Sequence, residues 1–176
     1  MPKREIESMI ALFTSNKFQD ALNAIEELIV ENPNDALLFN IRGACFAGLN
    51  QINLAKENYE KAIAINPEYS KAHFNLAGVF HELEEYEASI RSYQKTLLIE
   101  PDYAEAHNNL GNVFKYLKKH NESLKSYEHT YELNPDADYI IGNITHAYLH
   151  LCSWSRLSNF LNEFPKKISN GENALV

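Results

Sequence analysis

The sequence predicts an all-α fold in which antiparallel helix pairs stack one after another. Four of the six prolines, Pro33, Pro67, Pro101 and Pro135, recur at intervals of 34 residues. Aromatic and small residues recur at the same interval, within segments that have the apolar spacing of amphipathic helices. A fixed period of this kind indicates repeated units, and the spacing places two helices in each of them.

The periodic prolines predict where helices end. The tetrapeptides around them are Glu-Asn-Pro-Asn, Ile-Asn-Pro-Glu, Ile-Glu-Pro-Asp and Leu-Asn-Pro-Asp. Because proline disfavours helical geometry at the residue before it, the second helix of each unit is expected to stop there. We therefore expect Asn32, Asn66 and Asn134, each directly before a proline, to end helices.

Aromatic and small residues occupy matching positions in the predicted helices. Rings recur in the first helix at Phe46, Phe80, Phe114 and Tyr148, and in the second helix at Tyr59, Tyr93 and Tyr127. Small residues recur in the first helix at Gly43, Ala77 and Gly111, and in the second at Ala21, Ala55, Ser89 and Ser123. Since closely crossing helices need small side chains where their backbones approach, these residues are expected to form the core.

Composition excludes several classes of protein. The 176 residues carry a net charge of -8, which opposes a broad phosphate-binding surface, so nucleic acid is not expected as a partner. No run of 18 apolar residues occurs and no secretion signal begins the chain, so we expect no membrane span and a cytoplasmic location. Cys45 and Cys152 have no metal-ligand spacing and are expected to be reduced thiols.

With these features the sequence resembles the tetratricopeptide repeat (TPR) family, whose unit is a 34-residue helix-turn-helix. The resemblance implies a right-handed α-solenoid, with first helices on the concave face and second helices on the convex face. It divides the chain into units 2–35, 36–69, 70–103 and 104–137. The first unit departs most from the pattern, with Ser8 and Met9 at its first-helix core positions. His73 and His107 stand where the family carries a large aromatic residue, and we expect them to pack at helix edges.

Residues 138–168 are predicted to be a modified terminal unit, followed by a linker or tail at 169–176. Thr145 and Leu157 replace small residues, and Pro165 is expected to interrupt or kink the second helix. Segment 138–175 resembles the junction that precedes the catalytic half of bacterial O-linked N-acetylglucosamine transferase homologues. Ile144, Tyr148, Leu151 and Trp154 are expected to form an exposed apolar end that recruits another copy of the chain or a catalytic domain.

An asparagine row marks the candidate binding surface. Asn75, Asn109 and Asn143 hold the same position in successive units, and Asn112 is expected to face outward with Asn109. An asparagine amide can pair with both the C=O and the N–H of a passing peptide group. By resemblance, such a row lines the groove of the glycosyltransferase repeats. Asn108 is a further candidate. The competing explanation is composition, because the chain contains twenty asparagines.

Two histidines extend the candidate surface. His146 and His150 are four residues apart and are expected to face the same groove as Asn143, where they would form hydrogen bonds or titrate. Two ligands alone make no complete metal site, so no metal and no cofactor are expected. Tyr139, on the same arc, could stack on a ligand, although most tyrosines of this chain are expected in the core. No catalytic constellation is present.

The leading functional hypothesis is a scaffold that binds extended polypeptide or protein and recruits it to a glycosyltransferase active site beyond Val176. The alternative is a freestanding adaptor for assembling protein complexes, and an autonomous enzyme is the third possibility. Binding of a C-terminal carboxylate by a basic clamp is not favoured, because Glu105 and Asn109 stand where that clamp needs basic residues.

Overall fold

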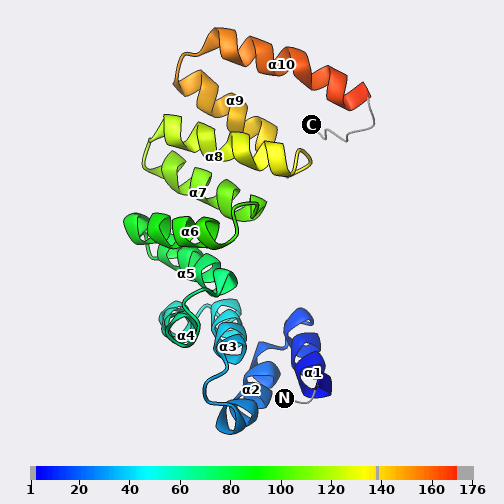
Figure 1. Ribbon diagram of the computed structural model, residues 1–176, viewed down its shortest axis with the longest axis vertical. Coiled ribbons are helices and arrows are strands. Elements are labelled where there is room, and N and C mark those ends of the chain that lie inside the picture. Colours follow the sequence, from blue (N-terminus) through cyan, green and yellow to red (C-terminus); the bar gives the residue numbers. More distant parts are fainter. Residues whose placement is uncertain (1–2, 138, 170–176) are drawn as a thin grey trace. The chain divides into compact units, whose positions relative to one another are not determined.

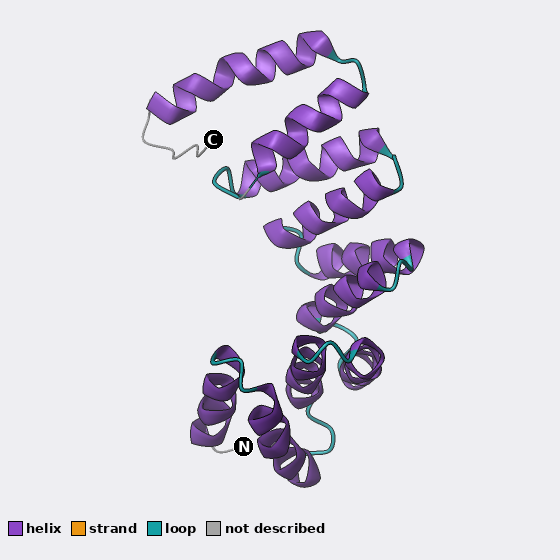
Figure 2. Ribbon diagram, turned by 180° about the vertical axis from the view of Figure 1, so that it is seen from behind, coloured by secondary structure: helices purple, strands orange, loops and turns teal. Residues whose placement is uncertain are grey.

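The computed structural model describes residues 3–137 and 139–169, with side chains described from residue 9 to residue 162 except at 138. These residues form ten helices (Figure 1) and, as Figure 2 shows, no strand. The helices are α1 Lys3–Thr14, α2 Phe18–Glu31, α3 Ala36–Gly48, α4 Ile52–Ile65, α5 Ser70–Glu82, α6 Tyr86–Ile99, α7 Ala104–Tyr116, α8 His120–Leu133, α9 Ile140–His150 and α10 Trp154–Ser169. They belong to two compact units, Met1–Ile99 and Glu100–Val176, which are described separately.

Each helix pair is closed by the same left-handed turn. The second residue after the first helix has a positive φ between 51° and 59° in all five pairs, at Asn16, Asn50, Glu84, Lys118 and Cys152. The next residue then donates its N–H to a carbonyl five positions earlier, as Lys119 does to Phe114 at 2.9 Å. This arrangement caps the last carbonyls of a helix and reverses the chain. The short turn brings the second helix back against the first.

Tyrosine rings of second helices cover glycines of first helices. A Cβ atom added to Gly43 would lie 2.7 Å from the Tyr59 ring, and one added to Gly111 would lie 2.6 Å from the Tyr127 ring. Both tyrosines are buried. The predicted core role of these residues is confirmed. Glycine is needed at both positions because no side-chain atom fits between the tyrosine ring and the helix backbone.

A buried serine hydroxyl reinforces two of the pairs. Ser89 donates to the carbonyl of Ala77 at 2.8 Å, and Ser123 donates to the carbonyl of Gly111 at 2.9 Å. Both serines are buried, so these bonds satisfy polar groups that water cannot reach. The small residues therefore contribute a hydrogen bond between paired helices as well as space.

The prolines and the two repeat histidines act together at the turns between pairs. Asn32, Asn66 and Asn134 are the residues that end α2, α4 and α8, as predicted. His73 and His107 each place Nε2 against the carbonyl of the preceding proline residue, at 3.0 Å from Pro67 and 2.9 Å from Pro101. These histidines were expected to pack at helix edges, and there each contacts the turn that precedes its own helix.

The predicted apolar open end is wrong. Ile144 and Tyr148 are buried in a cluster that includes Leu157, and Leu151 packs against it with Phe160, so α10 covers the face that was expected to be exposed. The Tyr148 hydroxyl donates to Glu128 at 2.6 Å, which fixes α9 against α8. Only Trp154 of the four predicted residues is largely exposed, at 62%.

Two residues of the terminal unit bear on smaller expectations. Pro165 does not interrupt its helix, because α10 runs through it to Ser169. Tyr139 is 86% exposed in a left-handed conformation directly before α9, so it lies outside the core and its ring is accessible to a ligand. None of the described helices combines the length and apolar character needed to cross a bilayer.

The contact between Gly111 and Tyr127 predicts a clear difference between two glycines. Gly111→Ala should lower the free energy of unfolding by about 1–3 kcal/mol, because the buried ring has to move. Gly142→Ala is the matched control, since a Cβ there meets nothing within 4 Å. It should raise stability by about 0.5–1 kcal/mol, the usual helix preference for alanine. Urea unfolding of both variants measures the difference, and a shift of the same sign in both would contradict the packing described.

Candidate functional site

The candidate site lies in the second compact unit, on α7 and α9. Asn109 on α7 and Asn143 on α9 are both half-buried, and neither side chain makes a hydrogen bond within the described residues. The charge of Lys115 on α7 acts on His146 of α9. Two amides with unused donors and acceptors are therefore carried by the first helices of successive repeats in one compact unit.

Asn75, the third member of the predicted row, has a different environment. It belongs to the first compact unit, where its Nδ2 donates to Oδ1 of Asn40 at 3.0 Å. Asn40 is only 7% exposed, so Asn75 satisfies a buried oxygen of the preceding repeat. Sequence reasoning missed Asn40. The signal available was its position, which Asn108 shares two repeats later.

Asn112 is half-buried, as Asn109 is, but its side chain is partly used within the fold. Its Oδ1 accepts a hydrogen bond from the Tyr127 hydroxyl at 2.7 Å. The ring of Tyr127 crosses α7 over Gly111, and its hydroxyl therefore reaches the next residue along the helix. This leaves mainly the N–H groups of Asn112 for a ligand.

Asn108 has no partner for its buried oxygen. Its Oδ1 is inaccessible to water and accepts no hydrogen bond within the described residues. Asn143 follows Asn108 by 35 residues, as Asn75 follows Asn40, but no bond joins that pair. Asn108 also lines a cavity of about 280 Å³ with Ala104, Glu105, Thr130, Asn134 and Ala137.

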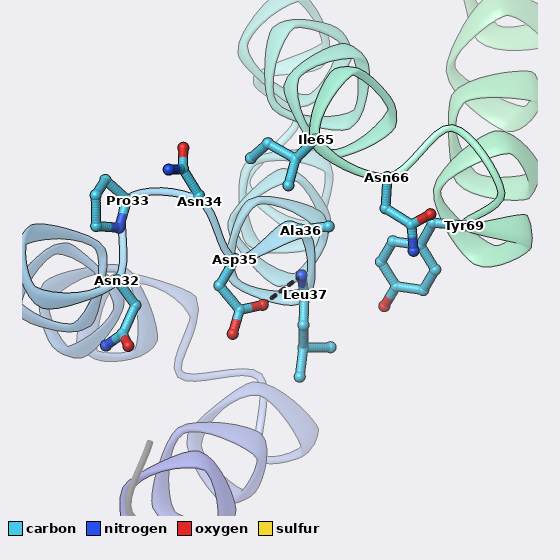
Figure 3. Close-up of a pocket in the computed structure, with 9 residues that line it drawn as sticks. All are labelled: Asn32, Pro33, Asn34, Asp35, Ala36, Leu37, Ile65, Asn66 and Tyr69. Atoms are coloured by element: carbon cyan, nitrogen blue, oxygen red, sulfur yellow. Dashed lines mark hydrogen bonds between the residues drawn. The ribbon is translucent and has the colours of Figure 1, made fainter.

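A larger, more open pocket of about 750 Å³ lies in the first unit (Figure 3). It is formed by the turn from Asn32 to Leu37 together with Ile65, Asn66 and Tyr69. The Asp35 carboxylate accepts from the backbone N–H of Leu37 at 2.9 Å, and so caps α3. The Asp35 side chain is therefore already used locally, and Tyr69 is the large side chain of this pocket.

Three histidine rings gather beside the candidate site. His146 and His150 place their Nε2 atoms 3.1 Å apart, and the ring of His120 at the start of α8 stacks on His150 with centroids 4.5 Å apart. Sequence reasoning identified the first two but missed His120, which comes from another helix. No group of three metal-ligating side chains surrounds a common point in the part of the chain that the structure describes.

Protonation of His146 is disfavoured. Burial lowers the pKa of His146 below its ordinary value, and the neighbouring His150, Lys115 and His120 lower it further. The physical reason is that a charge on His146 would lose hydration and meet other cationic groups. His146 is therefore suited to uncharged hydrogen bonding near neutral pH.

The lowered pKa of His146 predicts a pH-dependent stability. The unfolded chain binds this proton more readily, so the stabilisation is complete above about pH 6.5 and is lost as pH falls toward the folded-state pKa. His146→Gln should reduce the difference in unfolding free energy between pH 7.5 and pH 5, measured by urea unfolding. Asn121→Gln, an exposed change on α8, should keep the parent's dependence. An unchanged dependence in His146→Gln would show that other groups cause it.

Comparison with known protein families identifies the repeat. Models of the tetratricopeptide repeat match residues 38–69, 58–91 and 104–137, and a model described as TPR repeat matches residues 78–117. The four matches overlap and cover residues 38–137, which is more than half of the chain.

Curated relatives match over less than half of the chain. The peroxisomal targeting signal receptor of Saccharomyces cerevisiae is 30% identical over 83 residues, which are 44% of this chain and 14% of the receptor. The Hsp70-Hsp90 organizing protein of Triticum aestivum is 29% identical over 76 residues, 43% of this chain and 13% of that protein. The chain thus spans about one seventh of the length of these relatives.

Solved structures share the fold over most of the chain. MamA aligns with a TM-score of 0.80 and 21% identity, over 98% of this chain and 96% of MamA. PilF of Pseudomonas aeruginosa aligns with a TM-score of 0.82 and 16% identity, over 98% and 77%. YrrB, described as a TPR protein with an unusual peptide-binding site, gives 0.73 and 17%, over 92% and 84%. With its 34-residue helix pairs and four overlapping family matches, the chain belongs to the tetratricopeptide repeat family.

Proposed function

We propose that this chain is a scaffold that binds an extended polypeptide through the polar surface of α7 and α9. The observation that carries the proposal is that Asn109 and Asn143 hold the same repeat position in one compact unit, and their side chains make no hydrogen bond to any described residue. Each amide can pair with the C=O and the N–H of one peptide group. The polypeptide would then be held by its main chain, with little demand on its side chains.

The other polar residues have graded parts in this proposal. His146 would add an uncharged hydrogen-bonding group near neutral pH, and His150 contacts it. Asn112 contributes mainly its N–H donors, because its oxygen already accepts from Tyr127. Asn75 lies in the other compact unit, where it donates to Asn40, and is a separate candidate for peptide binding.

The relatives favour a protein-binding role. One is named as a receptor for a targeting signal and another as an organiser of two chaperones, and YrrB is described as having a peptide-binding site. These names favour an adaptor that assembles protein complexes over the other functions considered. The exposed free thiol of Cys152 fits the reducing cytoplasm that we propose as its location.

Recruitment to a glycosyltransferase remains a narrower prediction. It rests on the asparagine row and on the resemblance of segment 138–175, within which Trp154 at the start of α10 is largely exposed. Sequencing the coding region beyond Val176 tests it. A nucleotide-sugar-binding domain there would favour recruitment, and a reading frame that stops soon afterwards would favour the adaptor.

The binding proposal predicts that Asn109→Ala combined with Asn143→Ala weakens peptide binding about tenfold or more, because several main-chain hydrogen bonds are lost. Peptides selected against the full chain from an unbiased display library would serve as probes, with affinity measured by fluorescence anisotropy. The melting temperature should change little, since neither side-chain amide has a hydrogen-bond partner in the part of the chain that the structure describes. Asn121→Ala combined with Asn159→Ala, two exposed positions on second helices, is the matched control.

A main-chain test makes the proposal sharper. Methylating the peptide nitrogens opposite the two asparagines should weaken binding to the parent chain but have little further effect on the double variant. Equal affinity of parent and double variant would overturn the proposed contact. Asn75→Ala is unsuitable in this test, because it should destabilise the chain by about 1–3 kcal/mol through the unpaired oxygen of Asn40.

A further inference from the structure

We infer that the cavity at the start of α7 is a binding site for a tyrosine side chain of the bound polypeptide. It is lined by Ala104, Glu105, Asn108, Thr130, Asn134 and Ala137 and has a volume of about 280 Å³. A dry cavity of about 150 Å³ is enough to hold a benzene ring. The inference rests on the proposed function only in that a bound polypeptide supplies the ring.

The chain itself places a tyrosine at the corresponding position in the first compact unit. Tyr69 is the last residue of its repeat, and Ala137 is the last residue two repeats later. Tyr69 and Ala36 both pack against a buried cluster that contains Ala62. The residues that correspond to these two alanines are Ala104 and Thr130, and both line the cavity. The cavity therefore lies where a repeat of this chain accommodates a phenol ring.

The polar partner of that tyrosine is also repeated. Burial and the Asp35 carboxylate raise the pKa of Tyr69, whereas a side-chain hydrogen bond with Asn40 lowers it. The Asn40 oxygen is already paired with Asn75, so Asn40 offers Tyr69 its N–H group. The residue that corresponds to Asn40 is Asn108, which lines the cavity. With alanine in place of tyrosine at 137, the ring and the hydroxyl next to the asparagine are both missing.

The amide N–H of Asn108 determines which ligand fits. The Asn108 oxygen is inaccessible even to water, so its N–H groups are what Asn108 can offer in the cavity. A ligand that brings an acceptor for a buried donor is preferred over one of the same shape that lacks it. The Thr130 hydroxyl is already used, because it donates to the Ser126 carbonyl at 3.0 Å. A phenol provides both the ring and the acceptor oxygen.

The test compares two probes of nearly equal shape, 4-methylphenol and toluene, added to the full chain and followed by NMR. We expect saturable shifts of the Ala104 and Ala137 methyl signals, with 4-methylphenol bound about tenfold more tightly than toluene. Butylammonium is a third probe, because Glu105 would attract a lysine-like cation. Equal binding of the first two probes, or tighter binding of butylammonium, would overturn the inference.

Two substitutions locate the site. Ala137→Tyr should fill the cavity, abolish 4-methylphenol binding and raise the melting temperature more than Ala137→Phe, which brings no hydroxyl. Asn108→Leu should remove the preference for 4-methylphenol over toluene. Undiminished 4-methylphenol binding in Ala137→Tyr would show that the probe binds elsewhere and would overturn the inference.

A last comparison separates this inference from the proposed function. Asn109→Ala combined with Asn143→Ala should leave the affinity for 4-methylphenol unchanged while it weakens peptide binding. If only the first prediction fails, so that the double variant no longer binds 4-methylphenol, the tyrosine site is refuted. If only the second fails, so that the double variant binds peptides as tightly as the parent chain, the main-chain contact is refuted.

Discussion

The close crossing of paired helices, with a buried tyrosine ring lying over a glycine, is the constraint on which the other features of the fold depend. In α7 and α8 the ring of Tyr127 leaves no room for a side chain at Gly111. The same approach lets Ser123 reach the Gly111 carbonyl, and it carries the Tyr127 hydroxyl to Asn112. The crossing therefore determines which polar residues of a first helix are used internally and which remain for a ligand.

The periodicity of the sequence was sufficient to predict the helix pairs. Prolines and core residues recur at a fixed interval, and such an interval indicates that the same packing arrangement is repeated along the chain. The turns inside the pairs were not predicted. Glu84, Lys118 and Cys152 adopt a left-handed conformation that favours glycine or asparagine, so their identities carry no sign of it. Capping hydrogen bonds within the turn, such as that from Lys119 to Phe114, hold the conformation instead.

The candidate site could be predicted only in part. Helical periodicity correctly identified residues outside the core, but it could not show that a tyrosine from another helix would reach Asn112 or that His120 would join His150. The apolar end was misjudged for a similar reason. Leu157 and Phe160 complete the terminal core, and Pro165 masked the continuity of the helix that carries them. Each error concerns a contact between helices, which a single-helix pattern does not contain.

Repeats of similar sequence use the same position in different ways. The oxygen of Asn40 accepts from Asn75, whereas the buried oxygen of Asn108 has no partner among the described residues. A neighbouring position also differs, with Tyr69 in one repeat and Ala137 in the other. A repeated framework can therefore acquire a local binding site by omitting one side chain, with no change in the helices that surround it.

The five left-handed turns have a consequence for how the molecule opens. A non-glycine residue in this conformation costs about 1–2 kcal/mol, and this cost falls on Glu84, Lys118 and Cys152 more than on the two asparagines. Because repeat stacks open by local units whose stabilities are nearly independent, strain in a turn sets the exchange rate of the amides in its own helix pair. The identity of one turn residue thus changes how often one repeat opens locally, without changing the residues of its binding face.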